Sequence, residues 1–328
     1  MALLFMDGFD AGDVTQKWSS IGGGVDTTTR FSVGRSIVMG SGGYLLKSIT
    51  PVSKIIVGFA LSCSTVSDWN RLDFRADGGA ITHISIYVTS NGSIQIRRAG
   101  TALATSASGI VAHYVWNYIE CSATIHDSTG TVDVHCNGVS VVSFTGDTRN
   151  GGTSTNIDTI AFQGTTAVGN VNYIDDVYFC DDSGLAPYNT FLGDVRVYTL
   201  VPDAAGSSTQ LTPSSGANYT TVDELPYSST DYVSGTAGQT DLYSTANLPG
   251  GTGIIYGVQT NAIVKKTDAG NISGKTAIKS GATTYYGTTT ALGTTDVTLI
   301  DTRSLDPSTS AAWTSTGVNN IEIGIGAV

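Results

Sequence analysis

The segment from Tyr118 to Asn137 constrains the fold most, because it contains two strand patterns joined by a short turn. In both strands apolar and polar residues alternate with a period of two, as in a strand that is buried on one face. With a two-residue turn at Ser128-Thr129, the apolar face pairs Cys121, Ala123 and Ile125 with Cys136, Val134 and Val132. The other face carries Glu120, Ser122, Thr124, His126, Thr131, Asp133 and His135. We therefore predict an antiparallel sheet packed on one side and exposed to water on the other.

This register places Cys121 opposite Cys136. Such a pair is close enough for a cross-strand disulfide. The alternative is two buried thiols that behave as small apolar residues, which a reducing compartment favours.

The composition excludes several classes of protein. A net charge of −11 disfavours nucleic acid and anionic membranes as partners. The first residues, MALLFMDGFD, lack the basic start of a signal peptide, and no apolar run approaches the roughly 20 residues of a membrane helix. Charged residues make up only 13% and there are 40 glycines, which suits short strands joined by many turns.

Residue types are distributed unevenly along the chain. All four cysteines, all four histidines and three of the four tryptophans precede residue 182. We therefore expect two domains, 1–190 and 191–328, and both should be all-β because strand patterns recur between turn residues. The second is rich in Thr, Ser and Gly, with a long polar stretch over 204–250 and one short helix capped by Thr314 with Val318 and Ile321 facing inward.

A second hairpin is predicted around Ser90-Asn91-Gly92. A three-residue loop pairs Val88 with Ile94, Ile86 with Ile96, and Tyr87 with Gln95, so that each face is consistent. A two-residue Asn-Gly turn would mix apolar and polar residues on one face. We therefore expect the longer loop, with Gly92 at positive φ.

Four segments of the first domain resemble a laminin-G-like (concanavalin-A-like) jelly-roll sandwich. They are FMDGFDAGDVTQKW, YVWNYIECSATI, GTVDVHCNGVSVVSF and NYIDDVYFCDD, the last resembling a closing strand that pairs back near the start. The resemblance implies a β-sandwich over about residues 1–183 and, as in many such domains, one calcium ion. The second domain is expected to be β-sandwich-like.

The chain as a whole resembles virion structural proteins of tailed bacteriophages. The segments that carry this resemblance are FLGDVRVYTLVPDAAGSSTQLTP and DPSTSAAWTSTGVNNIEIG. It implies a protein made in the host cytoplasm and built into the virion as a capsid- or tail-attached decoration or appendage. Its partners would be other virion proteins and further copies of itself, for example in a trimer, and a cell-surface glycan would be a further ligand. The second domain would be the assembly element.

Catalytic patterns are weak. Glycoside hydrolysis needs two carboxyl groups across a cleft, and no strand carries an E-x-D-x-x-E array or similar. The segment AGNISGKT at 269–276 matches a relaxed phosphate-loop pattern, but a strand rather than a helix is expected after it. We therefore expect no enzyme and no cofactor.

Two kinds of binding site remain. If the first and last strands of the sandwich pair, Asp7, Asp10, Asp175 and Asp176 come close, and their hard oxygen ligands suit calcium; the alternative is that they shape turns. Tyr87 and Tyr114 are candidates for exposed rings that stack on sugars. They would serve the alternative function, a carbohydrate-binding receptor-recognition adhesin such as a tail fibre or spike head. A glycan hydrolase is a minor third hypothesis.

Overall fold

A computed structural model describes residues 1–328 except 1–2, 13–16, 32–33, 65–69, 165–169 and 252. It separates the chain into two compact units. The first consists of Met1–Phe9 and Trp18–Val197, and the second of Asp10–Lys17 and Tyr198–Val328. The first unit thus continues past residue 190, where the sequence analysis placed the boundary, as far as Val197.

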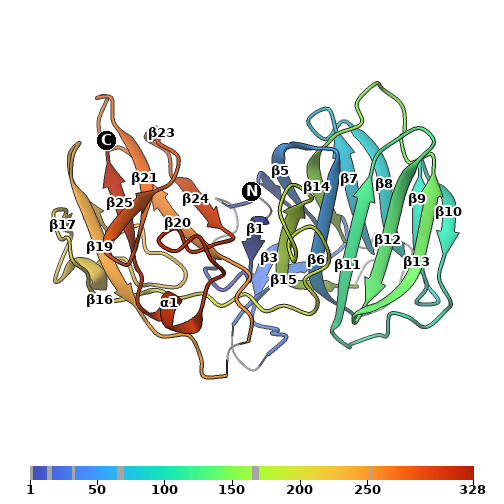
Figure 1. Ribbon diagram of the computed structural model, residues 1–328, viewed down its shortest axis with the longest axis horizontal. Helices are drawn as coiled ribbons and strands as arrows, with labels where there is room; N and C mark the ends of the chain where they lie inside the picture. Colours follow the sequence, from blue (N-terminus) through green and yellow to red (C-terminus); the bar gives the residue numbers. More distant parts are fainter. Residues whose placement is uncertain (1–2, 13–16, 32–33, 65–69, 165–169, 252) are drawn as a thin grey trace. The chain divides into compact units, whose positions relative to one another are not determined.

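The first unit contains two antiparallel sheets (Figure 1). Sheet A has eight strands in the order β13-β12-β11-β6-β15-β4-β3, with β1 also paired to β15. Its strands are β1 (Leu3–Asp7), β3 (Gly24–Asp26), β4 (Ser36–Met39), β6 (Lys54–Cys63), β11 (Asn117–Thr124), β12 (Gly130–Cys136), β13 (Val139–Gly146) and β15 (Asn172–Asp181). The expected pairing of the first strand with the last is confirmed, because Asp7 lies opposite Val177.

Sheet B has seven strands in the order β10-β9-β8-β7-β14-β5-β2. They are β2 (Ser20–Ile21), β5 (Tyr44–Val52), β7 (Asn70–Ala76), β8 (Ile81–Val88), β9 (Ile94–Arg98), β10 (Thr101–Thr105) and β14 (Ile157–Gln163). The apolar faces of the two sheets meet in a shared core. Phe59 of sheet A packs edge-on against Phe162 of sheet B at 4.9 Å, and Trp18 packs against both Phe162 and Phe179. The unit is an all-β sandwich of two antiparallel sheets, as predicted.

The hairpin at 118–137 has the predicted faces but a different register. Cys121, Ala123, Val132 and Val134 are all buried as expected. Cys121, however, lies opposite Val134, and Cys136 lies opposite Ile119, so the predicted cysteine pairing is wrong. The turn is longer than two residues because the Nδ1 atom of His126 accepts hydrogen bonds from the backbone N–H groups of residues 128 and 129.

The second predicted hairpin is confirmed in detail. Val88 pairs with Ile94, Ile86 with Ile96, and Tyr87 with Gln95. Gly92 has φ of 75°, so the loop uses its glycine as expected.

The second unit is built on a six-stranded sheet in the order β16-β19-β25-β21-β22, with β23 paired to β21. Two further strand pairs, β17–β18 and β20–β24, accompany it. The elements are β16 (Pro202–Ala205), β17 (Thr212–Pro213), η1 (Asn218–Thr221), β18 (Val233–Ser234), β19 (Thr240–Thr245), β20 (Val258–Val264), β21 (Ser273–Ser280), β22 (Thr283–Tyr286), β23 (Thr290–Ala291), β24 (Val297–Arg303), α1 (Ser315–Asn319) and β25 (Glu322–Ala327).

Three local predictions for this unit can be compared with the structure. Helix α1 is capped by Thr314, whose Oγ1 accepts from the N–H of Gly317 at 3.0 Å, and Val318 and Ile321 are buried as expected. The segment 269–276 leads into strand β21, as predicted, and not into a helix. The polar stretch 204–250 is less loop-like than expected, because its buried Leu242 and Tyr243 form part of strand β19 in the central sheet.

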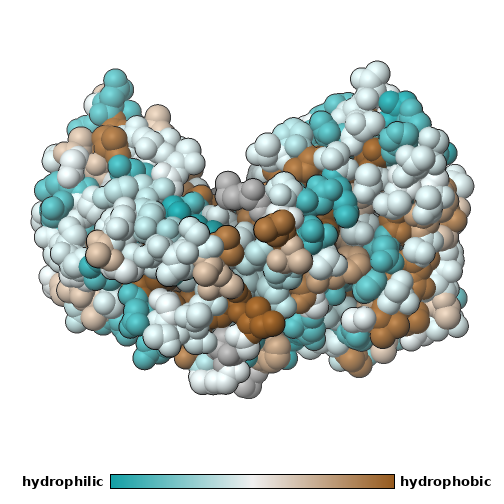
Figure 2. All heavy atoms as spheres, viewed as in Figure 1, coloured by the Kyte–Doolittle hydropathy of each residue, from teal (hydrophilic) through white to brown (hydrophobic). Residues whose placement is uncertain are grey.

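The visible surface in Figure 2 is mostly white and teal, with brown apolar atoms in scattered groups. This agrees with a chain in which neutral polar residues replace charged ones. Within the described part of the chain, no helix is both long and apolar enough to cross a membrane.

Burial protects the thiols of the sandwich. Each of the four cysteines is buried and none forms a disulfide, and all four lie within the described residues. Burial raises the pKa of Cys136 to about 11 and raises that of Cys121 well above its usual value. We therefore expect almost no reaction of the native chain with a thiol-specific disulfide reagent at pH 8, because the thiols stay protonated and covered. After unfolding in guanidinium all four should react, and fast labelling of the native protein would contradict this arrangement.

Candidate functional site

Six polar or aromatic residues form one continuous line across the outward face of sheet B. Each of them pairs with the next one across two neighbouring strands of the sheet. We call these six residues the polar row: Tyr44, Gln163, Arg71, Tyr87, Gln95 and Thr105. Their neighbours along the strands, such as Leu45, Leu72 and Phe162, point inward and are buried. Since adjacent strands lie about 4.8 Å apart, the row is about 24 Å long.

Hydrogen bonds hold four members of the row in place. Arg71 Nη1 donates to the hydroxyl of Tyr87 at 2.9 Å. Gln95 Nε2 donates to Thr105 Oγ1 at 2.9 Å, and Gln95 Oε1 accepts from Nε of Arg97, which lies beside the row. Such bonding fixes these four side chains before any ligand arrives, which lowers the entropy cost of binding.

A buried carboxylate organises the arginines beside the row. Asp73 is fully buried, and its Oδ2 atom accepts from Arg71 Nε at 3.1 Å and from Arg75 Nη2 at 2.6 Å. Its Oδ1 atom accepts from Ser85 Oγ at 2.6 Å. On the same side of the row as Asp73, the guanidinium carbon of Arg97 lies 4.1 Å from the ring centre of Tyr87, a cation–π contact.

One end of the row opens into a hollow of about 300 Å³. Its lining combines an aromatic ring, a primary amide, a guanidinium group and a floor of glycines, provided by Gly42, Gly43, Tyr44, Leu46, Arg75, Gln163 and Gly164. Among the described residues that line it, none is Asp, Glu or His.

Tyr44 owes its position in the hollow to a neighbouring glycine. Gly22 donates its N–H to the carbonyl oxygen of Tyr44 at 2.8 Å. A Cβ atom at Gly22 would lie 2.6 Å from Cε1 of the Tyr44 ring, so a larger residue would displace the ring. With glycine there, the ring is kept close to the sheet while 37% of the residue remains exposed.

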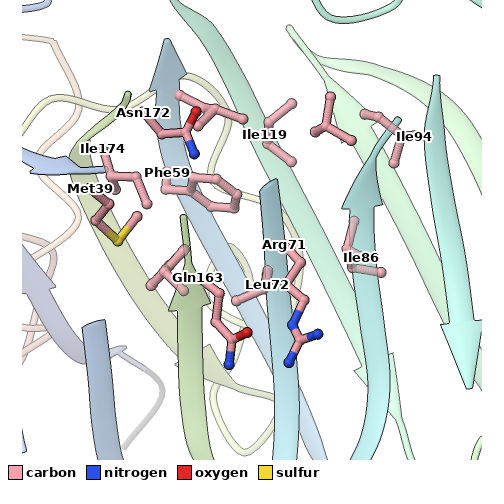
Figure 3. Close-up of a pocket in the computed structure, with 13 residues that line it drawn as sticks. Met39, Phe59, Arg71, Leu72, Ile86, Ile94, Ile119, Gln163, Asn172 and Ile174 are labelled. Atoms are coloured by element: carbon pink, nitrogen blue, oxygen red, sulfur yellow. The ribbon is translucent and has the colours of Figure 1, made fainter. Parts of the chain in front are cut away.

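Figure 3 shows how the row borders the interior of the sandwich. A small cavity of about 30 Å³ lies between the sheets, lined mainly by apolar residues such as Phe59 and Ile119. Arg71 and Gln163 border it from adjacent strands, and their polar ends point the same way, away from Phe59. The cavity is too small for a ligand, so the outward face is the candidate site.

The two predicted stacking residues differ in exposure and in position relative to the polar row. The expectation that Tyr87 is exposed is wrong: it lies in the polar row but only 6% of it is accessible, because Arg97 covers its ring. Tyr114 is 77% exposed at a positive φ of 56°, and it lies on none of the six strands that carry the row.

The four predicted calcium ligands do not form a metal site. Asp7 accepts from the N–H of Phe9 and from Nε1 of Trp18, and Asp175 Oδ1 accepts from the N–H of Asp176. Asp176 accepts from Arg30 and from the N–H of residue 197, while Asp10 belongs to the second unit. In the part of the chain that the structure describes, no three Asp, Glu, His or Cys side chains are grouped to hold an ion. At Asp176 the positive charge that calcium would provide comes from the guanidinium group of Arg30.

The sequence analysis missed most of the polar row. Tyr44, Gln163 and Arg71 come from strands far apart in the chain, so no local motif joins them. One signal was present, in the segment RLDFR at 71–75, where Arg71, Asp73 and Arg75 alternate with Leu72 and Phe74. Three charged residues at this spacing share one face of a strand.

No family model matches the chain, and no curated protein matches it. Several solved structures are similar to part of it. One is a sialidase, with 14% identity, 55% of this chain and 19% of the sialidase covered, and a TM-score of 0.44. Another is the cellulose-induced protein Cip1, with 16% identity, 58% of this chain and 100% of Cip1 covered, and a TM-score of 0.41.

A third is a protein from Bacillus subtilis with a galectin-like fold, with 12% identity, 55% of this chain and 96% of that chain covered, and a TM-score of 0.40. This chain spans about a fifth of the length of the sialidase.

Proposed function

We propose that the first unit binds carbohydrate on the outward face of sheet B, along the polar row and in the hollow at its end. The observation that carries this proposal is the row with its hollow, which combines the exposed ring of Tyr44, two primary amides and a guanidinium group in one line. Sugar rings offer apolar C–H faces to aromatic side chains and hydroxyl groups to planar amides and guanidinium groups. An open face of this length suits an extended oligosaccharide.

Binding without cleavage is the chemistry that this face supports best. The described residues that line the hollow contribute no carboxylate or imidazole. The nearest acid, Asp73, is fully buried and already bonded to two arginines and a serine. Because glycoside hydrolysis requires two carboxyl groups on either side of the scissile bond, we propose a non-enzymatic role.

Tyr44→Ala is expected to weaken binding to a glycan identified on a glycan array by about tenfold, since an aromatic contact of about 1.5 kcal/mol corresponds to that factor. The measurement is isothermal titration calorimetry with the full chain. The glycan should be recovered from the titration uncleaved.

Tyr114→Ala provides the matched comparison, because it removes a more exposed tyrosine of the same unit. Its affinity should equal that of the wild type. If Tyr114→Ala abolished binding and Tyr44→Ala did not, the site would lie at the loop that carries residue 114, and the assignment to sheet B would be wrong.

We also propose that the second unit attaches the protein to a virion, as the sequence resemblance suggests. Its small core supports an assembly role: among its described residues eight hydrophobic ones are buried, whereas Tyr232, Ile254, Tyr286 and other large apolar residues are exposed. Surfaces of this kind gain stability when they are covered by another subunit. We expect the full chain to sediment as an oligomer and to co-purify with particles, and a stable monomer absent from particles would refute the proposal.

A further inference from the structure

We propose that the glycan bound along the polar row is anionic and carries carboxylate groups, as polymers of uronic acids do. This inference rests on the proposed glycan binding and adds the chemical class of the ligand. The juxtaposition behind it is that of Arg71 and Arg75 on β7 and Arg97 on β9, two strands of one sheet face that are separated only by β8.

The charges of this face do not balance. Among the described outward-facing residues of β7, β8 and β9, Asp73 provides the carboxylate that Arg75 bonds, and the contacts of Arg97 are with the uncharged Gln95 and Tyr87. The chain as a whole has a net charge of −11, so a positive face is a local feature against the general trend. Like charges held close together on a protein surface raise its energy unless an anion neutralises them.

Two of the arginines have donors that no described protein group uses. Arg75, which lines the hollow, bonds Asp73 through Nε and Nη2, so its Nη1 has no described partner. Arg97 bonds Gln95 through Nε, and its guanidinium carbon lies over the ring of Tyr87, so its two Nη groups have no described acceptor. A guanidinium group presents parallel N–H donors whose spacing matches the two oxygens of a carboxylate.

The arrangement also indicates an extended, repeating ligand. The hollow with Arg75 and the ring with Arg97 lie on β7 and β9, which are separated by β8. Two carboxylate sites at this separation suit successive acidic sugars of one chain better than a single small anion. Tyr44 and Gln163, which line the hollow together with Arg75, would then contact the sugar rings there.

The test compares two ligands that differ only in charge. An oligogalacturonate and the same oligosaccharide with its carboxyl groups reduced to primary alcohols are titrated into the full chain. The acidic form should bind at least about tenfold more tightly, since a charge-assisted hydrogen bond exceeds a neutral one by about that factor. Its advantage should shrink as salt concentration rises.

Arg75→Gln and Arg97→Gln should each reduce affinity for the acidic form about tenfold and affinity for the reduced form much less, since only the acidic form loses a charge-assisted bond. An unchanged circular dichroism spectrum and unfolding midpoint would show that each variant is folded. Arg98→Gln is the matched control, because Arg98 is the next residue on β9 and is bonded to Asp147 instead. It should bind both forms as the wild type does.

Equal binding of the acidic and reduced forms would overturn the inference while leaving the proposed glycan binding intact. Preference for a sulfated glycan without carboxyl groups over the oligogalacturonate would overturn the assignment to carboxylates. If no saccharide bound, both the inference and the proposed function would fail.

Discussion

Gly58→Ala is expected to lower the free energy of unfolding of the sandwich by about 3 kcal/mol, the upper end of the usual cost of overpacking a core. A Cβ atom at residue 58 would lie only 2.0 Å from Cε1 of Tyr178. The ring cannot turn aside, because the Tyr178 hydroxyl donates to Glu120 at 2.6 Å and accepts from the N–H of Leu192 at 3.1 Å. Strand β6 would have to move, and it lies between β11 and β15 within sheet A.

Gly24→Ala is the control for this experiment. Gly24 lies in β3 of the same sheet, and a Cβ atom there would meet only the Val38 side chain, at 4.0 Å. Urea unfolding followed by fluorescence should therefore show a large shift for Gly58→Ala and little change for Gly24→Ala. Equal midpoints for the two variants would show that Tyr178 can move, contrary to its two hydrogen bonds.

The parts of the fold that were predictable from the sequence are those set by neighbouring residues. The alternation of Ile84, Ile86 and Val88 with polar residues, followed by an Asn-Gly pair, determined both the faces and the register of that hairpin. Thr314 before an apolar pair determined the helix in the same way. In each case the decisive interaction spans only a few residues.

The register at 118–137 could not be obtained that way. Both candidate registers bury the same apolar residues, because they differ by two positions and the side-chain period is two. The choice depends on His126, whose ring bonds the turn, and on Thr148, whose hydroxyl accepts from the N–H of residue 126. Thr148 is distant from the hairpin in the sequence, so no local pattern predicts its hydrogen bond to residue 126.

The candidate site is less predictable than the fold for the same reason. Tyr44, Gln163 and Arg71 meet only because β5, β14 and β7 are neighbours in sheet B. The order of the strands in sheet B depends on how the whole chain folds into the sandwich, and no single segment determines it. The single residue of the row that the sequence did suggest, Tyr87, lies in a hairpin whose register was itself predictable.

The outer face of sheet A shows how a correct pattern can still mislead. Glu120 was expected to face water, yet it is only 1% exposed. Its Oε1 atom accepts from the hydroxyl of Tyr178 and, at 2.8 Å, from the N–H of Gly193. Burial and the Glu120 carboxylate raise the pKa of Tyr178, which keeps its hydroxyl protonated and able to donate. The chain after residue 190 therefore covers a face that the alternation of residues marked as polar.

Glu120→Ala is accordingly expected to lower the free energy of unfolding by about 3 kcal/mol, because it leaves two buried donors without their acceptor. It should also release the segment around Gly193 from sheet A, since one of its bonds to the sheet is lost. Limited proteolysis should then cut the variant within residues 188–197 faster than the wild type. Glu120→Gln should have a smaller effect, because its amide oxygen can still accept a hydrogen bond.

Ser122→Ala is the matched control, since Ser122 is on the same face of β11, two residues along. It should leave both the unfolding midpoint and the cleavage rate close to those of the wild type. If Glu120→Ala were destabilised but its cleavage pattern did not change, the segment would be held by Asp176 and Arg30 alone. Both contact it further along, Asp176 at the N–H of Val197 and Arg30 at the carbonyl oxygen of Val195, and Glu120 would then serve only to fix Tyr178 over Gly58.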